Sequence, residues 1–183
     1  MLFRSILSQT LFDILIIVLL LGALVIGFIQ GAIRRVLGIL AIVLSFLVAA
    51  NLREPVGGYL AEHWRQYPAP FSVMLGFLMM FLIGWVALSV LIQGFYRRSL
   101  IHPSEQLDEI LGALLGVVQG LLLLAVVGFI LDSYYLTAAE GAVGIEGLHS
   151  LWSAWDPSQM ARLMRDVVFP AGLGLLGWLI PAA

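Results

Sequence analysis

Four long apolar segments constrain this chain more than any other feature of its sequence. They run over about residues 11–33, 36–52, 71–95 and 110–131. The hydrocarbon core of a bilayer is about 30 Å thick, and a helix crosses it with about 20 apolar residues. The first two segments joined as one straight helix would be about 63 Å long, which is twice that thickness. The sequence therefore predicts an all-α integral membrane protein with four transmembrane helices arranged as two hairpins, the first turning at the arginine pair Arg34-Arg35.

The composition agrees with a lipid-facing surface. Hydrophobic residues make up 62% of the chain and charged residues 11%, with a mean hydropathy of +1.07. A soluble domain is about 45–50% apolar and about 25% charged. The net charge of -2 gives no reason to expect a nucleic-acid partner, so membrane lipid is the predicted surrounding.

The sequence lacks the residue patterns of catalytic and metal sites. There is no cysteine, which excludes disulfides and thiolate ligands. The three histidines, His63, His102 and His149, lie far apart without metal-ligand spacing, and neither a Ser-His-Asp arrangement nor a phosphate-binding loop is recognisable. We therefore expect a protein that is not an enzyme, with no catalytic residue, metal or cofactor.

The chain divides into residues 1–132, the predicted transmembrane domain, and residues 133–183. Between the second and third spans, Arg53–Pro70 is the first clearly polar connection. Beyond Asp132, the small and glycine-containing stretch Ser133–Leu148 is typical of a linker.

A helix start is predicted at residues 156–159, with Asp156 as the N-cap and Pro157 at the first helical position. Apolar residues then recur at three-to-four spacing, which predicts an amphipathic interfacial helix on the membrane surface. These residues are Met160, Leu163, Met164, Val167 and Val168. Residues 167–180 are apolar but short and contain Pro170, so we expect a re-entrant or interfacial tail, with a fifth span as the alternative.

A short sequence repeat closes the first and third spans. Residues 29–35 read Ile-Gln-Gly-Ala-Ile-Arg-Arg, and residues 92–98 read Ile-Gln-Gly-Phe-Tyr-Arg-Arg. Gln30, Gly31 and Arg34 of the first copy thus correspond to Gln93, Gly94 and Arg97 of the second. An internal duplication of one hairpin would explain the repeat, and apolar spans that end in arginines by chance are the alternative.

The two arginine pairs also bear on orientation. Arginines close to span ends favour the cytoplasmic side. If both pairs lie on one side, that side carries four arginines against Arg4, Arg53 and Arg65 on the other. The sequence therefore favours cytoplasmic arginine pairs and an N-terminus outside.

Three glycines mark one face of the fourth span. Gly112, Gly116 and Gly120 are spaced by four residues, which places them on one side of a helix where another backbone can approach closely. The stripe predicts close helix packing, either inside the monomer or between copies of the chain.

Polar residues within the apolar segments are the remaining site candidates. Asp13 and Asp132 lie near span ends on the same predicted side, where they either face the interface or form a shared polar site. Asp108 stands at the start of the fourth span, where a carboxylate favours the positive end of the helix dipole. Gln30, Gln93 and Gln119 are expected to form hydrogen bonds between helices.

These residues resemble the bacterial colicin V production protein (CvpA) family. The resemblance rests on Asp13 followed by residues 27–35, and on residues 108–112 followed by Gly116, Gln119, Gly120 and Asp132. It covers Phe12 to Asp132, and the chain beyond Asp132 shows none. Members commonly have Arg-Gly where Gln30-Gly31 and Gln119-Gly120 stand, and Glu where Arg35 stands.

The resemblance implies a four-span, multi-pass protein of the bacterial inner membrane that supports colicin V or toxin production and envelope homeostasis through protein partners. The residues that carry over are Asp13, Gly31, Arg34, Asp108, Gly112, Gly116, Gly120 and Asp132. Two other readings stay open. One is a small homo-oligomeric transporter or channel with a polar path near Asp13 and Asp132, and the other is a structural subunit of a larger complex.

Overall fold

The computed structural model describes residues 2–95, 105–136 and 145–176, and every regular element in these ranges is helical. Four long helices come first, followed by a set of short ones. The long helices are α1 (Leu2–Gln30), α2 (Ala32–His63), α3 (Ala69–Phe95) and α4 (Glu105–Tyr135). Each contains a segment long and apolar enough to cross a bilayer, which agrees with the four predicted spans.

The first turn lies at Gly31 rather than at the arginine pair. Gly31 has a φ of 78° and a ψ of 167°, a conformation that is almost confined to glycine and costs other residues about 1–3 kcal/mol. Its N–H donates to the carbonyl of Gly27 (3.0 Å), which closes the end of α1. Arg34 and Arg35 therefore lie in the first turn of α2, because the single glycine suffices to reverse the chain.

Helix α2 continues well beyond the apolar segment, through Pro55 to His63, so the expected polar connection from Arg53 is shorter than predicted. The reason is close packing between α2 and α3 at this end. Gly57 is buried, and a Cβ on it would lie 2.5 Å from the Cα of Val73. Contact with α3 thus maintains the helix beyond Pro55.

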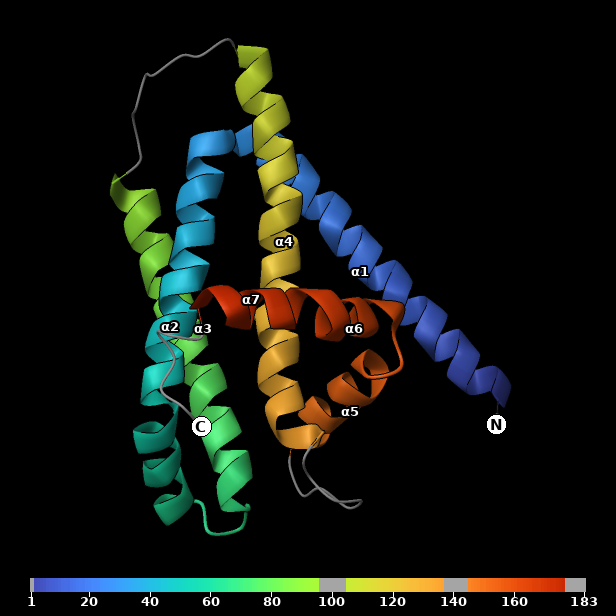
Figure 1. Ribbon diagram of the computed structural model, residues 1–183, viewed down its shortest axis with the longest axis vertical. Helices are drawn as coiled ribbons and strands as arrows, with labels where there is room; N and C mark the ends of the chain where they lie inside the picture. Colours follow the sequence, from blue (N-terminus) through green and yellow to red (C-terminus); the bar gives the residue numbers. More distant parts are fainter. Residues whose placement is uncertain (1, 96–104, 137–144, 177–183) are drawn as a thin grey trace.

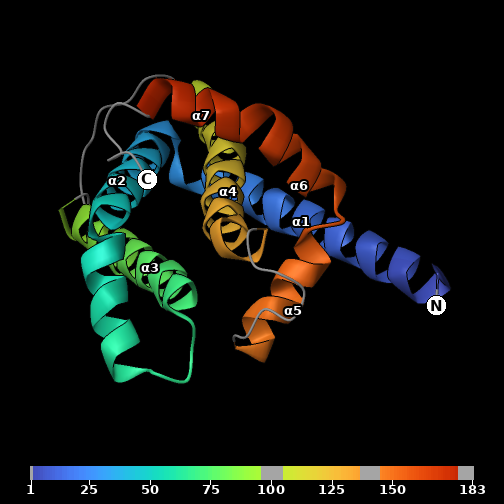
Figure 2. The same cartoon turned by 60° about the horizontal axis from the view of Figure 1, so that its bottom comes forward.

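The helices do not pair as two closed hairpins. α2 packs along α3, and α1 packs along α4, whereas α1 and α2 diverge from their shared turn and make few contacts with each other. Figure 2 shows α1 extending away from α2 and α3 on the far side of α4. α4 therefore occupies the centre of the fold, with contacts to all three other long helices.

The main core lies between α2, α3 and α4. Aromatic and aliphatic side chains from all three helices are buried there, including Ile42, Phe71, Phe77, Phe81 and Ile130. Burial of a side chain of this size contributes about 1.5–3 kcal/mol in water, but within a bilayer its contribution comes from close packing instead.

The glycine stripe of α4 packs against α1 in the same monomer. A Cβ on Gly112 would overlap the backbone of Gly27 and Gly31, and a Cβ on Gly116 would overlap the carbonyl oxygen of Ala23 and lie 3.0 Å from the Cα of Gly27. The two helix backbones are in contact along this face. Of the two readings of the stripe, packing within the monomer therefore accounts for both glycines.

The C-terminal part forms two arms joined near residue 157. The first is α5 (Glu146–Trp155); the second is a continuous run of α6 (Gln159–Leu163), a π-helical turn η1 (Met164–Val168) and α7 (Phe169–Leu176). The second arm crosses α4 at a steep angle (Figure 1). Its N-cap is Ser158, whose hydroxyl accepts a hydrogen bond from Ala161 N (3.1 Å). Asp156 is helical and ends α5, so the predicted cap is off by two residues.

Of the apolar residues predicted to form one stripe on this arm, some are buried against the protein and others are exposed. Ala161 and Met164 are fully buried in a small core with Ile16 of α1 and Trp155 of α5. Leu163 and Val167 are exposed. Attachment to a membrane surface stays a prediction for these exposed residues, and the apolar tail after residue 176 lies outside the described residues.

The π-helical turn lies directly before Pro170. A proline has no N–H to donate, and its ring collides with the carbonyl four residues earlier in a regular α-helix. Here the N–H of Phe169 donates five residues back, to Met164, which widens the helix ahead of the proline. Such π-turns are frequent at functional sites, and this one contains Arg165.

Candidate functional site

A buried carboxylate in the last turn of α4 organises the largest polar cluster of the described residues. The side chain of Asp132 is almost fully buried. Arg165 grips it with two parallel hydrogen bonds, from Nε to Oδ2 and from Nη2 to Oδ1, both 2.7 Å long. This bidentate arrangement is the strongest geometry that an arginine and a carboxylate can form.

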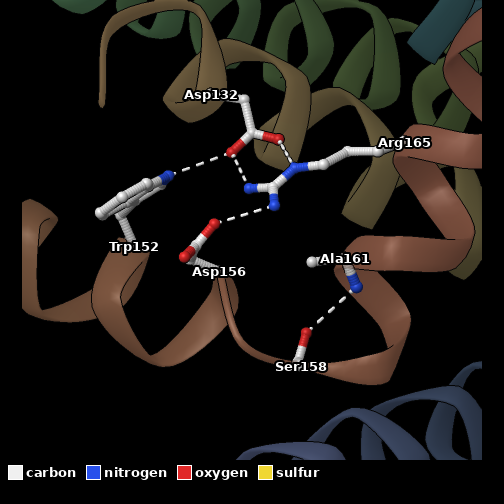
Figure 3. Close-up of polar contacts among 6 residues, drawn as sticks. All are labelled: Asp132, Trp152, Asp156, Ser158, Ala161 and Arg165. Atoms are coloured by element: carbon white, nitrogen blue, oxygen red, sulfur yellow. Dashed lines mark hydrogen bonds and ion pairs between the residues drawn. The ribbon is translucent and has the colours of Figure 1, made fainter. Parts of the chain in front are cut away.

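Two further side chains complete the group, which we call the Asp132 cluster (Asp132, Trp152, Asp156 and Arg165; Figure 3). The indole Nε1 of Trp152 donates to Asp132 Oδ1 (3.0 Å), and Nη1 of Arg165 donates to Asp156 Oδ1 (2.8 Å). Both oxygens of Asp132 therefore have donors. The cluster joins α4 to both C-terminal arms.

The charges within the cluster support one another. The hydrogen bond to Asp132 raises the pKa of Arg165 above its usual value, while burial works in the opposite direction and the hydrogen bond to Asp156 adds to the increase. Arg165 is thus held in its charged form. Two carboxylates against one guanidinium leave the cluster with one negative charge, and Asp156 is its more exposed member.

Local structure explains how Arg165 reaches α4. Ser158 caps the second arm and fixes its starting direction, and Ala161 and Met164 anchor the arm on its buried side. Arg165 lies four residues after the buried Ala161, so it shares the buried side of the arm. The arm thus presents an arginine to α4 while it buries apolar side chains against the same helix.

A second polar site lies at the turn between α1 and α2. Asp108 of α4 accepts a hydrogen bond from the N–H of Ala32 (3.0 Å), so it caps the first turn of α2 from a different helix. Asp108 was expected at the start of its own helix, and the structure adds this contact to α2. A Cβ on Gly31 would overlap the Asp108 side chain, so the glycine is required for this contact as well as for the turn.

One turn into α2, Arg35 is buried with 8% of its surface exposed. Its Nη1 donates to Oε1 of Gln119 on α4 (2.8 Å). This is an interhelical hydrogen bond of the kind predicted for Gln119. Among the described residues the arginine forms no ion pair.

The remaining predicted residues are not drawn into either site. Asp13 of α1 is half-buried, one of its oxygens has no partner, and no hydrogen bond joins it to the Asp132 cluster among the described residues. Gln30 is exposed at the end of α1, and Gly94 is exposed with open space around it. Arg34 is half-buried. The side chain of Gln93 lies outside the described residues.

Sequence reasoning did not identify Arg165, Trp152 and Asp156 as partners of Asp132. The one available signal was that a carboxylate at the end of an apolar span requires a compensating charge. Arg162 and Arg165 both follow on the next predicted helix, and spacing alone did not select between them. The position of the second arm against α4, which brings Arg165 to Asp132, leaves no simple pattern in the sequence.

The Asp132 cluster is built from ion pairs and hydrogen bonds between side chains. In the part of the chain that the structure describes, no three His, Asp or Glu side chains come close enough to share a metal ion. The oxygens of Asp132 are occupied by protein donors. The Asp132 cluster can thus fix one part of the fold to another.

Four apolar helices that can each cross a bilayer, with a C-terminal helical segment fixed to the fourth by an ion pair, define a multi-pass membrane protein. The family model for the colicin V production protein matches residues 12–168, most of the chain, so the chain belongs to this family. No curated protein and no solved structure matches the chain.

The extent of this match corrects one prediction. The resemblance was expected to end at Asp132, but the family match continues through the second C-terminal arm to residue 168. It therefore includes Asp132, Trp152, Asp156 and Arg165. The C-terminal arms are part of the family's domain up to this point, and not an unrelated extension.

The departures from the family pattern are also related in space. From the resemblance, an acidic residue is expected at position 35 and a basic one at position 119. The structure places Arg35 and Gln119 in direct hydrogen-bond contact.

Proposed function

We propose that this protein is a non-enzymatic accessory protein of the bacterial inner membrane that supports the production or export of a peptide toxin, and envelope homeostasis, through protein partners. Family membership supports the association with colicin V production. The observation that carries the accessory role is the Asp132 cluster, in which the buried carboxylate is used to hold the C-terminal arms against α4. The arms then form a fixed surface that a partner can recognise.

A transporter with a polar path through Asp132 receives less support. A carboxylate has about four positions at which it can accept a hydrogen bond, and three of those of Asp132 are taken by donors within the protein. Both oxygens of Asp132 accept hydrogen bonds from Arg165, and one accepts a third from Trp152. The glycine stripe that would join several copies packs against α1 instead.

The test is complementation of a deletion strain of the native host. Peptide-toxin export and sensitivity to bile salts are measured with wild type, Asp132→Asn, Arg165→Gln and Gly116→Leu. If the ion pair fixes the arms for a partner, removal of either member has the same effect, so Asp132→Asn and Arg165→Gln should reduce complementation to a similar extent. Gly116→Leu should reduce it by separating α1 from α4.

Arg162→Gln is the matched control. Arg162 lies three residues before Arg165 on the same arm, but its side chain is exposed, so this variant should complement fully. A transport role for Asp132 predicts a different outcome: Asp132→Asn would abolish function while Arg165→Gln, with normal membrane levels, retained it. A deletion without any defect in either assay would contradict the proposed function itself.

A further inference from the structure

Arg35 carries hydrogen-bond donors that no described residue satisfies. Its Nε and Nη2 atoms are buried and have no hydrogen-bond partner among the described residues, where only Nη1 is bonded, to Gln119. A buried arginine normally has its charge paired and its donors bonded, because leaving either unmet is costly. Polar groups of this kind within membrane proteins usually mark a functional site.

The unused donors form one edge of the guanidinium group. Nε and Nη2 are the same two atoms that Arg165 uses to grip the carboxylate of Asp132. This edge matches two oxygens of a carboxylate or a phosphate. Within the described residues, one arginine edge is thus occupied by an oxyanion, and a second, buried one has none.

The surroundings of Arg35 favour an external anion over an internal one. Asp108, the carboxylate at the turn between α1 and α2, is bonded to the N–H of Ala32, and no acidic side chain of the described residues pairs with Arg35. Arg34 adds a second positive charge, and the first turn of α2 contributes the positive end of its helix dipole.

Depth in the membrane selects the kind of anion. The candidate span of α2 begins at Ala32, so Arg35 lies within one helical turn of its end. The phosphates of phospholipids lie at the membrane interface, close to this level. Because Nε and Nη2 are covered in this structure, a headgroup reaches them only when the side chains around Arg35 move aside. Basic groups between helices at this level are suited to acidic lipid headgroups.

We propose that Arg35 is a binding site for the phosphate of an anionic phospholipid, held by Nε and Nη2, with the contact to Gln119 orienting the guanidinium group. The site is independent of the Asp132 cluster and of the proposed function.

The test uses the full-length protein in lipid nanodiscs of phosphatidylcholine alone or of phosphatidylcholine mixed with phosphatidylglycerol. The midpoint of thermal unfolding is measured. For wild type we expect the anionic lipid to raise Tm by about 3–6 °C, which is the size that one charge-assisted contact gives in a chain of this length. Arg35→Gln should lose this increase, and Arg34→Gln, the adjacent control, should keep most of it.

Inorganic phosphate added to phosphatidylcholine nanodiscs distinguishes the source of the anion. We expect no change in Tm. An increase that depends on Arg35 would support the oxyanion site and assign it to free phosphate. An equal response of wild type and Arg35→Gln to phosphatidylglycerol would overturn the proposal.

A second variant, Gln119→Glu, tests the proposal if Arg35→Gln fails to fold. Gln119→Glu places a carboxylate where Arg35 Nη1 now meets an amide oxygen at 2.8 Å. This internal partner should raise Tm in phosphatidylcholine alone and reduce the response to phosphatidylglycerol to less than half. A Gln119→Glu protein with the full wild-type response would contradict a lipid site at Arg35.

Discussion

The buried polar residues of this protein differ in how many of their hydrogen-bonding atoms have partners. Asp132, with 6% of its surface exposed, has a donor for each oxygen, whereas the similarly buried Arg35 bonds through only one of its three guanidinium nitrogens among the described residues. Burying a charge costs several kcal/mol unless its partners are well placed. Substitutions at Asp132 should therefore disturb stability, while those at Arg35 should change the response to a ligand.

Loss of either member of the Asp132–Arg165 ion pair should destabilise the C-terminal arms. We expect Asp132→Asn and Arg165→Gln each to cost roughly 2–4 kcal/mol, because each leaves a buried group without its charged partner. Limited proteolysis between α4 and α5 measures the release of the arms. The double variant should cost less than the two single costs added together; strict additivity would show that the two side chains act separately.

Gly31→Ala should be costly although it adds only one methyl group. The residue has a positive φ of 78°, and the new Cβ would overlap the Asp108 side chain. We expect the free energy of unfolding to fall by more than about 1 kcal/mol, measured as resistance to unfolding in detergent. Gly58→Ala is the control, since Gly58 lies within α2 with open space around it, and it should be neutral.

At the scale of helices, the sequence predicts which segments form spans better than it predicts where each helix ends or which helices pack together. All four spans are readable because an apolar segment of sufficient length has few alternatives in a bilayer. The pairing of the helices cannot be read from the sequence in the same way, because small residues on several faces permit close packing in more than one way. The match between Gly27 and the α4 stripe, which joins α1 to α4, becomes evident only when both helices are seen.

The π-helical turn at Met164–Val168 shows a second limit of sequence reasoning. Helical periodicity correctly indicated a helix in this region, and Pro170 indicated a break. The chain instead accommodates the proline by widening the turn ahead of it. Regular helical spacing already places Arg165 on the same face as the buried Ala161, four residues earlier. The sequence did not indicate which helix this face packs against, and so the partner of Asp132 was missed.

Close packing of α1 on α4 predicts different effects for two glycines on one helix. Gly27→Ala should destabilise the protein by about 1–3 kcal/mol, because the added Cβ would lie 3.0 Å from the Cα of Gly116 and overlap the Gly112 backbone. Gly22→Ala should be neutral or slightly stabilising, since nothing lies within 4 Å of its Cβ. Thermal unfolding of the two purified variants measures the difference, and equal effects would contradict this packing.

For the whole molecule, the two ends of the four-helix region can be distinguished in cells. The absence of native cysteine allows single cysteines at Gln66, in the α2–α3 connection, and at Gln106, at the start of α4; both side chains are exposed. With the N-terminus outside, as the arginine pairs favour, Gln66→Cys should react with an impermeant maleimide in intact cells. Gln106→Cys should react only after lysis, and the reverse pattern would reverse the orientation.

The central place of α4 has a consequence for how the chain is made. Ribosomes add about 5–20 residues per second, so α1 is synthesised several seconds before the helix on which it packs. During that interval the small-residue face of α1 at Ala23 and Gly27 has only lipid, α2 or the insertion machinery beside it. The order of synthesis therefore makes α1 docking a late event, and a ribosome stalled before Gly112 would leave the first helix without its partner.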